Sequence, residues 1–338
     1  MPPLLEIEDL RVEFDTYGGV VQAVRGVDLR VERGATLAIV GESGCGKSVT
    51  VQAVMGLVPM PPGRVTSGSA RLEGRELLGR PTAEVNAVRG SEIAMIFQDP
   101  MTSLNPTMKI GRQIAETLQV HRGMDAKAAL ARAVELLDKT RIPEAAKRAQ
   151  QYPFEFSGGM LQRAMIAMSL ACSPKVLIAD EPTTALDVTI QAQILELMRQ
   201  LQQDEQMAVV LITHDLGVVA RMADEVAVMY AGQIVESGPV DRIFNRSSHP
   251  YTLGLRRAMP RTGHGDVGHV LQPIDGSPPD LFAPPEGCAY FARCPHAMQL
   301  CERRPVPLFD VEKGHQARCW LQHASAPAVE GLHRGEAS

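Results

Sequence analysis

The sequence has few aromatic residues and no long apolar run. Phe, Trp and Tyr make up 4% of the 338 residues, with a single Trp. The longest apolar segments, such as 164–171 and 208–212, fall far short of the roughly 20 residues that a helix needs to cross a bilayer. The first ten residues include acidic side chains and no basic ones, whereas a secretion signal begins with basic residues. We therefore expect a protein that folds in the cytosol and has no membrane span of its own.

An excess of basic charge is also missing. The net charge is −5, which gives no general attraction to nucleic acid or to anionic lipid. Hydrophobic residues make up 45% of the chain and charged residues 22%, as in an ordinary globular protein. A chain of 338 residues is long enough for one large domain and one small one.

Short β-rich apolar runs alternate with segments of helical periodicity through the first three quarters of the chain. This alternation predicts an α/β core with a mainly parallel sheet. The predicted strands are 5–14, 26–31, 35–40, 175–180, 207–213 and 225–232, and the clearest helices are 126–139 and 188–203.

The regular pattern stops near residue 260. Residues 272–287 are rich in Pro and Gly and predict a loop. We therefore divide the chain into a nucleotide-binding domain over 1–258, a small irregular cysteine-rich domain over 259–325 and a flexible tail over 326–338.

A phosphate-binding loop follows the strand predicted at 35–40. "GESGCGKS" (41–48) matches G-x-x-x-x-G-K-[ST] between a strand and a helix. Glycines allow successive backbone N–H groups to turn toward an anion, and the helix N-terminus adds its own. Lys47 would reach the β- and γ-phosphates of a nucleotide, and Ser48 would ligate Mg²⁺. The candidate nucleotide-binding residues here are Gly41, Ser43, Gly44, Cys45, Gly46, Lys47, Ser48 and Val49.

A second acidic site is predicted at the end of the strand 175–180. "KVLIADEP" carries an apolar strand to Asp180 at its carboxyl end, where ligands of open α/β sheets bind. Asp180 would hold Mg²⁺, and Glu181 would act as general base or orient the attacking water.

Another helix N-terminus suited to phosphate begins at "FSGGMLQR" (156–163). One nucleotide already has its own phosphate loop, so a second phosphate-binding helix suggests that two subunits share the nucleotide.

With these motifs the sequence resembles the ATP-binding-cassette (ABC) ATPases over residues 5–258. That resemblance implies a P-loop ATPase core with a helical subdomain and an antiparallel β subdomain, in a head-to-tail dimer with ATP between the subunits. It implies that Gln98 senses Mg²⁺ and the γ-phosphate, that His214 holds the γ-phosphate, and that Asp187 couples the two sites. Ser157, Gly158 and Gly159 would contact the nucleotide of the partner.

The segment upstream of the phosphate loop offers more than one residue that could contact the adenine. In the resembled family an aromatic residue upstream of the phosphate loop has this role, and Tyr17 is the candidate. Val20 or Val21 in the same segment is the alternative.

One branch of the family is most similar. "MIFQDPMTSLNP" (95–106), "HPYT" (249–252) and the cysteine-bearing tail resemble ATPase subunits of bacterial dipeptide, oligopeptide and nickel importers, above all the dipeptide permease's first ATPase subunit. The resemblance implies a second ATPase, preferably in a heterodimer, two membrane-spanning permease subunits and, indirectly, an extracytoplasmic binding protein. It also implies a peripheral location on the cytoplasmic face of the inner membrane.

Two alternatives remain open at this point. The cargo is a dipeptide or oligopeptide, or else nickel or another small solute. A soluble ABC ATPase acting on DNA or ribosomes is disfavoured, because Ser157 lies only 110 positions after Lys47 (157 − 47), and because the chain is acidic.

Four of the six cysteines gather near the end of the chain, at Cys288, Cys294, Cys301 and Cys319. Cytosolic thiols stay reduced, so metal ligation is favoured over disulfides. The wide spacing is unlike the paired knuckles of structural zinc sites. It predicts a 4Fe–4S cluster, with Zn²⁺ as the alternative and free buried thiols as the remaining interpretation. The resemblance to peptide importers extends to these four positions.

Overall fold

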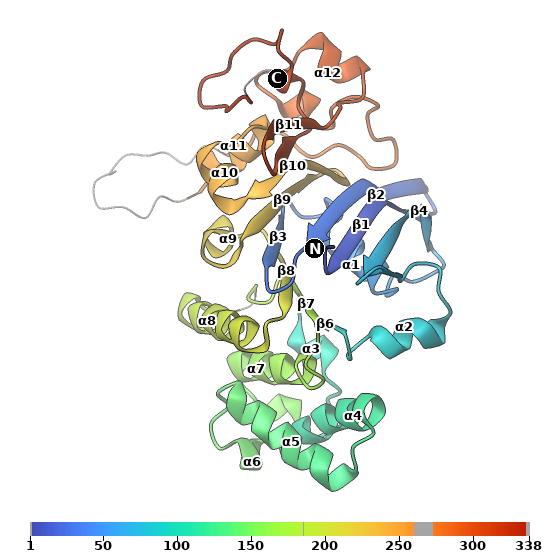
Figure 1. Ribbon diagram of the computed structural model, residues 1–338, viewed down its shortest axis with the longest axis vertical. Coiled ribbons are helices and arrows are strands. Elements are labelled where there is room, and N and C mark those ends of the chain that lie inside the picture. The colour runs from blue at the N-terminus through green and yellow to red at the C-terminus, as the bar shows by residue number, and fades with distance from the viewer. Residues whose placement is uncertain (1, 185, 260–272, 336–338) are drawn as a thin grey trace, which may run out of the picture. The chain divides into compact units, whose positions relative to one another are not determined.

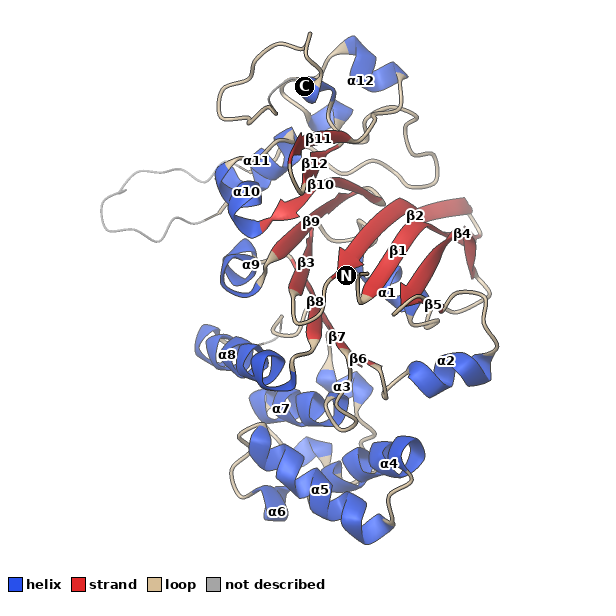
Figure 2. Cartoon of the chain, in the orientation of Figure 1, coloured by secondary structure: helices blue, strands red, loops and turns tan. Residues whose placement is uncertain are grey.

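The computed structural model describes residues 2–184, 186–259 and 273–335, in two compact units. The first unit comprises residues 1–5, 31–36 and 72–212, and the second comprises 6–30, 37–71 and 213–338. Figure 2 shows that helices predominate in part of the first unit and strands in the second. The predicted α/β class is confirmed.

The first unit contains three parallel strands whose residues are almost entirely apolar. β6 (Ile93–Ile96) pairs with β7 (Val176–Asp180), which pairs with β8 (Ala208–Thr213). Every residue of these strands is buried, as is typical of parallel strands covered on both faces. The other elements of this unit are β5 (Arg75–Glu76), α2 (Thr82–Val88), α3 (Pro100–Ser103), α4 (Ile110–Arg122), α5 (Ala126–Lys139), α6 (Ala145–Arg148), η1 (Pro153–Glu155), α7 (Gly158–Ser169) and α8 (Val188–Glu205).

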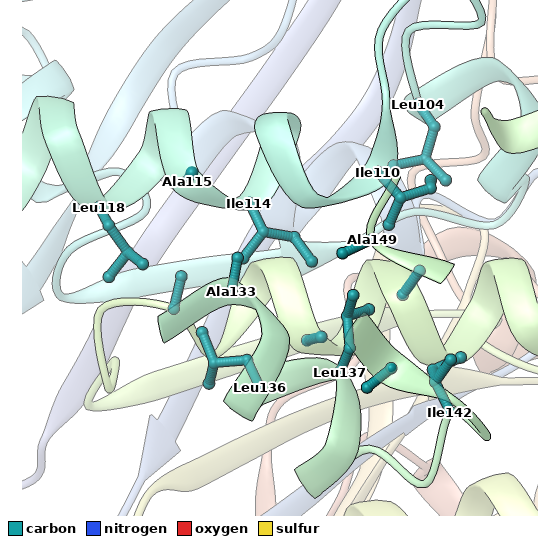
Figure 3. Packing of buried hydrophobic residues seen from close by; sticks show 14 of the residues in the cluster. Leu104, Ile110, Ile114, Ala115, Leu118, Ala133, Leu136, Leu137, Ile142 and Ala149 are labelled. Atoms are coloured by element: carbon teal, nitrogen blue, oxygen red, sulfur yellow. The ribbon is translucent and has the colours of Figure 1, made fainter. Parts of the chain in front are cut away.

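A helical group within this unit has its own core, formed by α4, α5 and α7 (Figure 3). Its helices have distinct ends: the side chain of Asp125 caps α5 by accepting the N–H groups of Lys127 and Ala128. α4 ends at Gly123, which adopts the left-handed conformation that favours glycine. The buried apolar side chains in the core of this group include Leu104, Ile110, Ile114, Leu118, Leu136, Leu137, Ile142 and Leu161.

The second unit combines a small antiparallel sheet with a larger, mixed one. β1 (Leu5–Thr16) lies between β2 (Gly19–Val31) and β4 (Gly63–Leu72). β3 (Thr36–Val40) pairs in parallel with β9 (Glu225–Tyr230), and β10 (Gln233–Pro239) continues the sheet in antiparallel register. The helices are α1 (Lys47–Val54), α9 (Leu216–Met222), α10 (Val240–Asn245) and α11 (Pro250–Arg257).

The segment predicted to be a small irregular domain also contributes strands. β11 (Phe309–Glu312) and β12 (His315–Ala317) form a hairpin whose second strand pairs with β10 (Figure 1). Its helical turns are η2 (Phe291–Arg293), α12 (Gln299–Arg303) and η3 (Trp320–Gln322). In the predicted tail, Leu332 is buried against Leu253. Residues 260–272 of this segment and 336–338 of the tail lie outside the described residues.

Candidate functional site

The phosphate loop lies between β3 and α1 in the second unit. Gly41 and Gly46 pack so closely that a side chain has no room: a Cβ atom would lie 2.1 Å from the carbonyl oxygen of Met229 and 2.3 Å from that of Ala23. Both glycines have positive φ angles, 156° and 105°. Ser43 and Gly44 are exposed at the tip of the loop, whereas Cys45 is buried beneath it, and Val49 is half-buried in the first turn of α1.

Lys47 lies under the loop, not in solvent. Its side chain is buried, and Nζ donates to the carbonyl oxygens of Gly41 at 2.8 Å and Glu42 at 2.9 Å. Burial raises the pKa of the neighbouring Cys45 thiol. Ser48, the next residue of α1, is half-buried. The ammonium group is therefore positioned by the loop that it would serve.

The acidic end of β7 belongs to the first unit. Asp180 is the last residue of this strand and is buried. Glu181 follows with a positive φ of 45°, a conformation that costs energy for a residue with a side chain. Its carboxylate oxygen Oε2 accepts hydrogen bonds from Nε2 of Gln98 at 3.0 Å and from Oγ1 of Thr184 at 2.9 Å. Its backbone N–H donates to Ile212 in β8.

Thr184 was missed as a site residue by the sequence reasoning. The signal was present, since Thr184 opens the "TALD" motif (184–187) three residues after Glu181. Ala185 of this motif lies outside the described residues. Asp187 caps α8 by accepting the N–H of Ile190 at 2.9 Å. The side chain of Asp187 is exposed to solvent.

The second predicted phosphate-binding helix is α7. Ser157 caps it, with Oγ accepting the N–H of Met160 at 3.4 Å. Gly159 packs against Ile190, where a Cβ atom would lie 2.9 Å from Cγ2. Ser157 and Gly158 are both exposed, so the N-terminus of α7 is open to a second molecule.

Two further candidates lie in the second unit. His214 is exposed in the turn between β8 and α9. The neighbouring Asp215 caps α9 through the N–H groups of Gly217 and Val218. Tyr17 is fully exposed in the turn between β1 and β2. Val20 is also exposed and Val21 half-buried, so exposure does not separate the three candidates for the adenine contact.

The four C-terminal cysteines line one small cavity, together with His249 and Trp320. All four thiols are free, and Cys301 and Cys319 are buried. Burial, together with a smaller effect of neighbouring thiols, raises the pKa of Cys288 and of Cys294 to about 11. Among the residues that the structure describes, no group of three or more His, Cys, Asp or Glu side chains is arranged to hold a metal ion. The predicted cluster is thus not confirmed.

Two buried N–H donors beside these cysteines lack an acceptor within the described part of the chain. Nδ1 of His249 accepts the N–H of Tyr251 at 3.0 Å, so the proton of the neutral ring is on Nε2. Complete burial lowers the pKa of His249 to about 3, which keeps the ring neutral. Nε2 of His249 and Nε1 of Trp320 are buried without a hydrogen-bond partner. The cavity is therefore lined by four free thiols and has two buried N–H donors beside it.

Comparisons with known proteins agree with these motifs. Residues 24–184 match the family model for the ABC transporter, and residues 235–301 match that for the C-terminal region of oligopeptide and dipeptide transporters. The chain is 57% identical to the oligopeptide transport ATP-binding protein OppD of Bacillus subtilis, over 97% of this chain and 91% of that protein. The chain belongs to the ABC transporter family.

Other members extend the comparison. The dipeptide transport ATP-binding protein DppD of Bacillus subtilis is 51% identical to this ABC protein, over 96% of the chain and 97% of the relative. The solved dimer of MJ0796, a bacterial ABC transporter cassette, superposes with a TM-score of 0.63 and 26% identity, covering 70% of this chain and 98% of the cassette. These similarities confirm the predicted ATPase class. Within the described residues, no helix is both long and apolar enough to span a membrane.

Proposed function

We propose that this chain hydrolyses ATP to energise the import of oligopeptides or dipeptides through membrane-spanning partner subunits. The observation that supports this most is the similarity to OppD of Bacillus subtilis over nearly the whole length of both chains. The match of residues 235–301 to the C-terminal region of oligopeptide and dipeptide transporters favours the same cargo over nickel.

Each site residue has a role in this proposal. Lys47 and the N–H groups of the phosphate loop bind the phosphates of ATP, and Ser48 and Asp180 supply oxygen ligands for Mg²⁺. Glu181 orients the attacking water and accepts its proton, with its carboxylate held by Gln98 and Thr184. His214 contacts the γ-phosphate, and Tyr17 the adenine.

The exposed N-terminus of α7 supports the proposed assembly. We infer that Ser157, Gly158 and Gly159 bind the γ-phosphate of ATP held by a second ATPase, while Asp187 couples the two sites. A heterodimer of related ATPases is favoured over a homodimer. The complex would include two permease subunits, would receive cargo from an extracytoplasmic binding protein, and would place this chain on the cytoplasmic face of the inner membrane.

The proposed division of the chain keeps the boundaries at 258/259 and 325/326. Within the second part, we propose that Cys288, Cys294, Cys301 and Cys319 hold a 4Fe–4S cluster, with Zn²⁺ as the alternative. Support comes from the cavity that all four line and from the two N–H donors without acceptors beside it. A bound cluster would supply a rigid core to a segment with few large apolar side chains.

Growth of a deletion strain tests the cargo. Wild-type chain should restore growth on dipeptides or oligopeptides as the sole source of a required amino acid, and Glu181→Gln should not. Uptake of radiolabelled peptides and of nickel should be measured in the same strains. Restored nickel uptake without peptide uptake would contradict the peptide proposal and leave the ATPase in place.

A further inference from the structure

Glu42, the second residue of the phosphate loop, is held from the C-terminal part of the second unit. Its backbone N–H donates to the hydroxyl of Tyr251 at 2.9 Å. Its carboxylate oxygen Oε2 accepts from Nη1 of Arg293 at 2.8 Å. Its carbonyl oxygen is one of the two that accept from Lys47. Two of the three polar groups of this loop residue are therefore satisfied by residues more than 200 positions away in the sequence.

Arg293 is itself immobilised on the other side of this ion pair. Its side chain is only 6% exposed. Nε donates to the carbonyl oxygen of Asp275 at 2.9 Å, and Nη2 donates to that of Ile274 at 3.2 Å. The guanidinium also lies 5.8 and 5.9 Å from the ring centroids of Tyr230 and Tyr290. A guanidinium with this many fixed partners holds the Glu42 carboxylate in one place.

The pairing has an electrostatic consequence for an anion in the loop. The Glu42 carboxylate belongs to a loop built to receive phosphates, and an unpaired negative charge there would repel them. Arg293 neutralises this charge at short range, in a partly buried setting where screening by salt is weak. It also steadies the carbonyl of Glu42 that positions the Lys47 ammonium.

We propose that Arg293 is a positioning residue for nucleotide binding, through which the cysteine-bearing segment supports the phosphate loop. Arg293 acts through Glu42 and touches no nucleotide itself. Cys294 follows Arg293 directly, so the residue that holds Glu42 belongs to the cysteine-bearing segment. The inference rests on the proposed function, since it concerns the affinity of this loop for ATP.

Binding of a fluorescent ATP analogue to the full-length chain, with Mg²⁺, tests the proposal. Arg293→Ala should raise the dissociation constant about tenfold, as expected for losing a hydrogen bond to a charged group. The double variant Glu42→Gln, Arg293→Ala should recover most of this affinity, because the unpaired carboxylate is gone. Arg304→Ala removes an exposed arginine of the same segment and should bind like the wild type.

A purely structural role for Arg293 would give a different pattern. The double variant would then bind no better than Arg293→Ala. The positioning role also predicts that, in the assembled transporter, Arg293→Ala raises KM for ATP and leaves kcat close to that of the wild type. Wild-type affinity in Arg293→Ala, or a double variant as weak as the single one, would overturn the inference while leaving the proposed function intact.

Two milder variants keep the test decisive if Arg293→Ala does not fold. Arg293→Lys keeps the charge but loses the planar fork, and Tyr251→Phe removes only the hydroxyl that accepts the N–H of Glu42. Both should bind ATP several-fold more weakly at unchanged thermal stability, and unchanged affinity in both would overturn the proposal. A wild-type chain that binds no ATP would instead overturn the proposed function, and this inference with it.

Discussion

The side-chain amide of Gln98 donates to the carboxylate of Glu181, with Nε2 and Oε2 3.0 Å apart. Gln98 follows β6 and Glu181 follows β7, so two neighbouring parallel strands deliver the pair to the same edge of the sheet. Thr184 donates to the same oxygen, and Glu181 adopts a left-handed backbone conformation. This carboxylate is thus held in a defined position, as a residue that orients a water molecule must be.

Glu181→Gln should bind ATP but hydrolyse it at least about a hundredfold more slowly, because the amide cannot accept a proton. Turnover should be measured in the assembled transporter, together with equilibrium binding of ATP. Lys47→Ala is the contrasting variant, since it should lose nucleotide binding itself. Wild-type turnover in Glu181→Gln would rule out Glu181 as the catalytic carboxylate.

Ser157→Arg places a long side chain at the exposed N-terminus of α7. ATP binding to this chain's own phosphate loop should persist, whereas hydrolysis by the assembled complex should fall at least about a hundredfold, as expected when a transition-state contact is lost. The two quantities are measured on the same preparation. Equal losses of binding and turnover would show that α7 does not serve a neighbour's nucleotide.

Met101→Glu should weaken attachment to the permease subunits. Met101 lies in α3, just after Gln98, and its apolar side chain is about half exposed. A buried, unpaired carboxylate at an interface is costly, so less of this chain should co-purify with the membrane subunits. ATP binding by the isolated chain serves as the control. We expect residues 101–106, which follow Gln98, to face the permease subunits. Full recovery of the complex would place the contact elsewhere.

Protein purified without oxygen should be brown, absorb at about 400 nm and contain about four irons per chain. Cys301→Ser should lose most of the iron. Cys172→Ser is the matched control, because Cys172 is also buried but does not line the cysteine cavity. Colourless protein with one zinc per chain would replace the cluster by zinc and keep the four ligands.

His315→Ala should lower the free energy of unfolding by about 1–3 kcal/mol, because it removes one hydrogen-bond partner of a buried carboxyl group. Nε2 of His315 lies 2.8 Å from Oε1 of Glu236, and both side chains are fully buried. Glu236 also accepts the N–H groups of Ser248 and His249, at the start of α11. Thermal unfolding checks the prediction, with the exposed His323 changed to Ala as control. An unchanged midpoint would contradict it.

Local patterns in the sequence predicted the elements that carry the nucleotide motifs. The apolar runs 35–40, 175–180 and 207–213 became β3, β7 and β8 with shifts of one residue at their starts. The helix predicted over 126–139 coincides with α5. These elements are buried or strongly amphipathic, so their periodicity is visible without tertiary information.

Elements with weaker local signals were not predicted. Only three of the ten residues of β4 (Gly63–Leu72) are apolar and only three are buried, and its strand conformation depends on pairing within the sheet. The hairpin β11–β12 pairs with β10, from which it is separated by about 70 residues or more. Pairing between segments so far apart in the sequence cannot be predicted from the pattern of apolar residues within either segment.

The sequence by itself determined the phosphate loop, because a strand, a glycine turn and a helix N-terminus form such a site from consecutive residues. It also determined which carboxylates end the buried strand β7. Only the tertiary structure decided what holds these groups in place. Arg293 meets Glu42 across 251 positions of sequence, and Gln98 meets Glu181 across 83. Such pairs are made by packing, in which side chains become neighbours through the fold and not through their spacing.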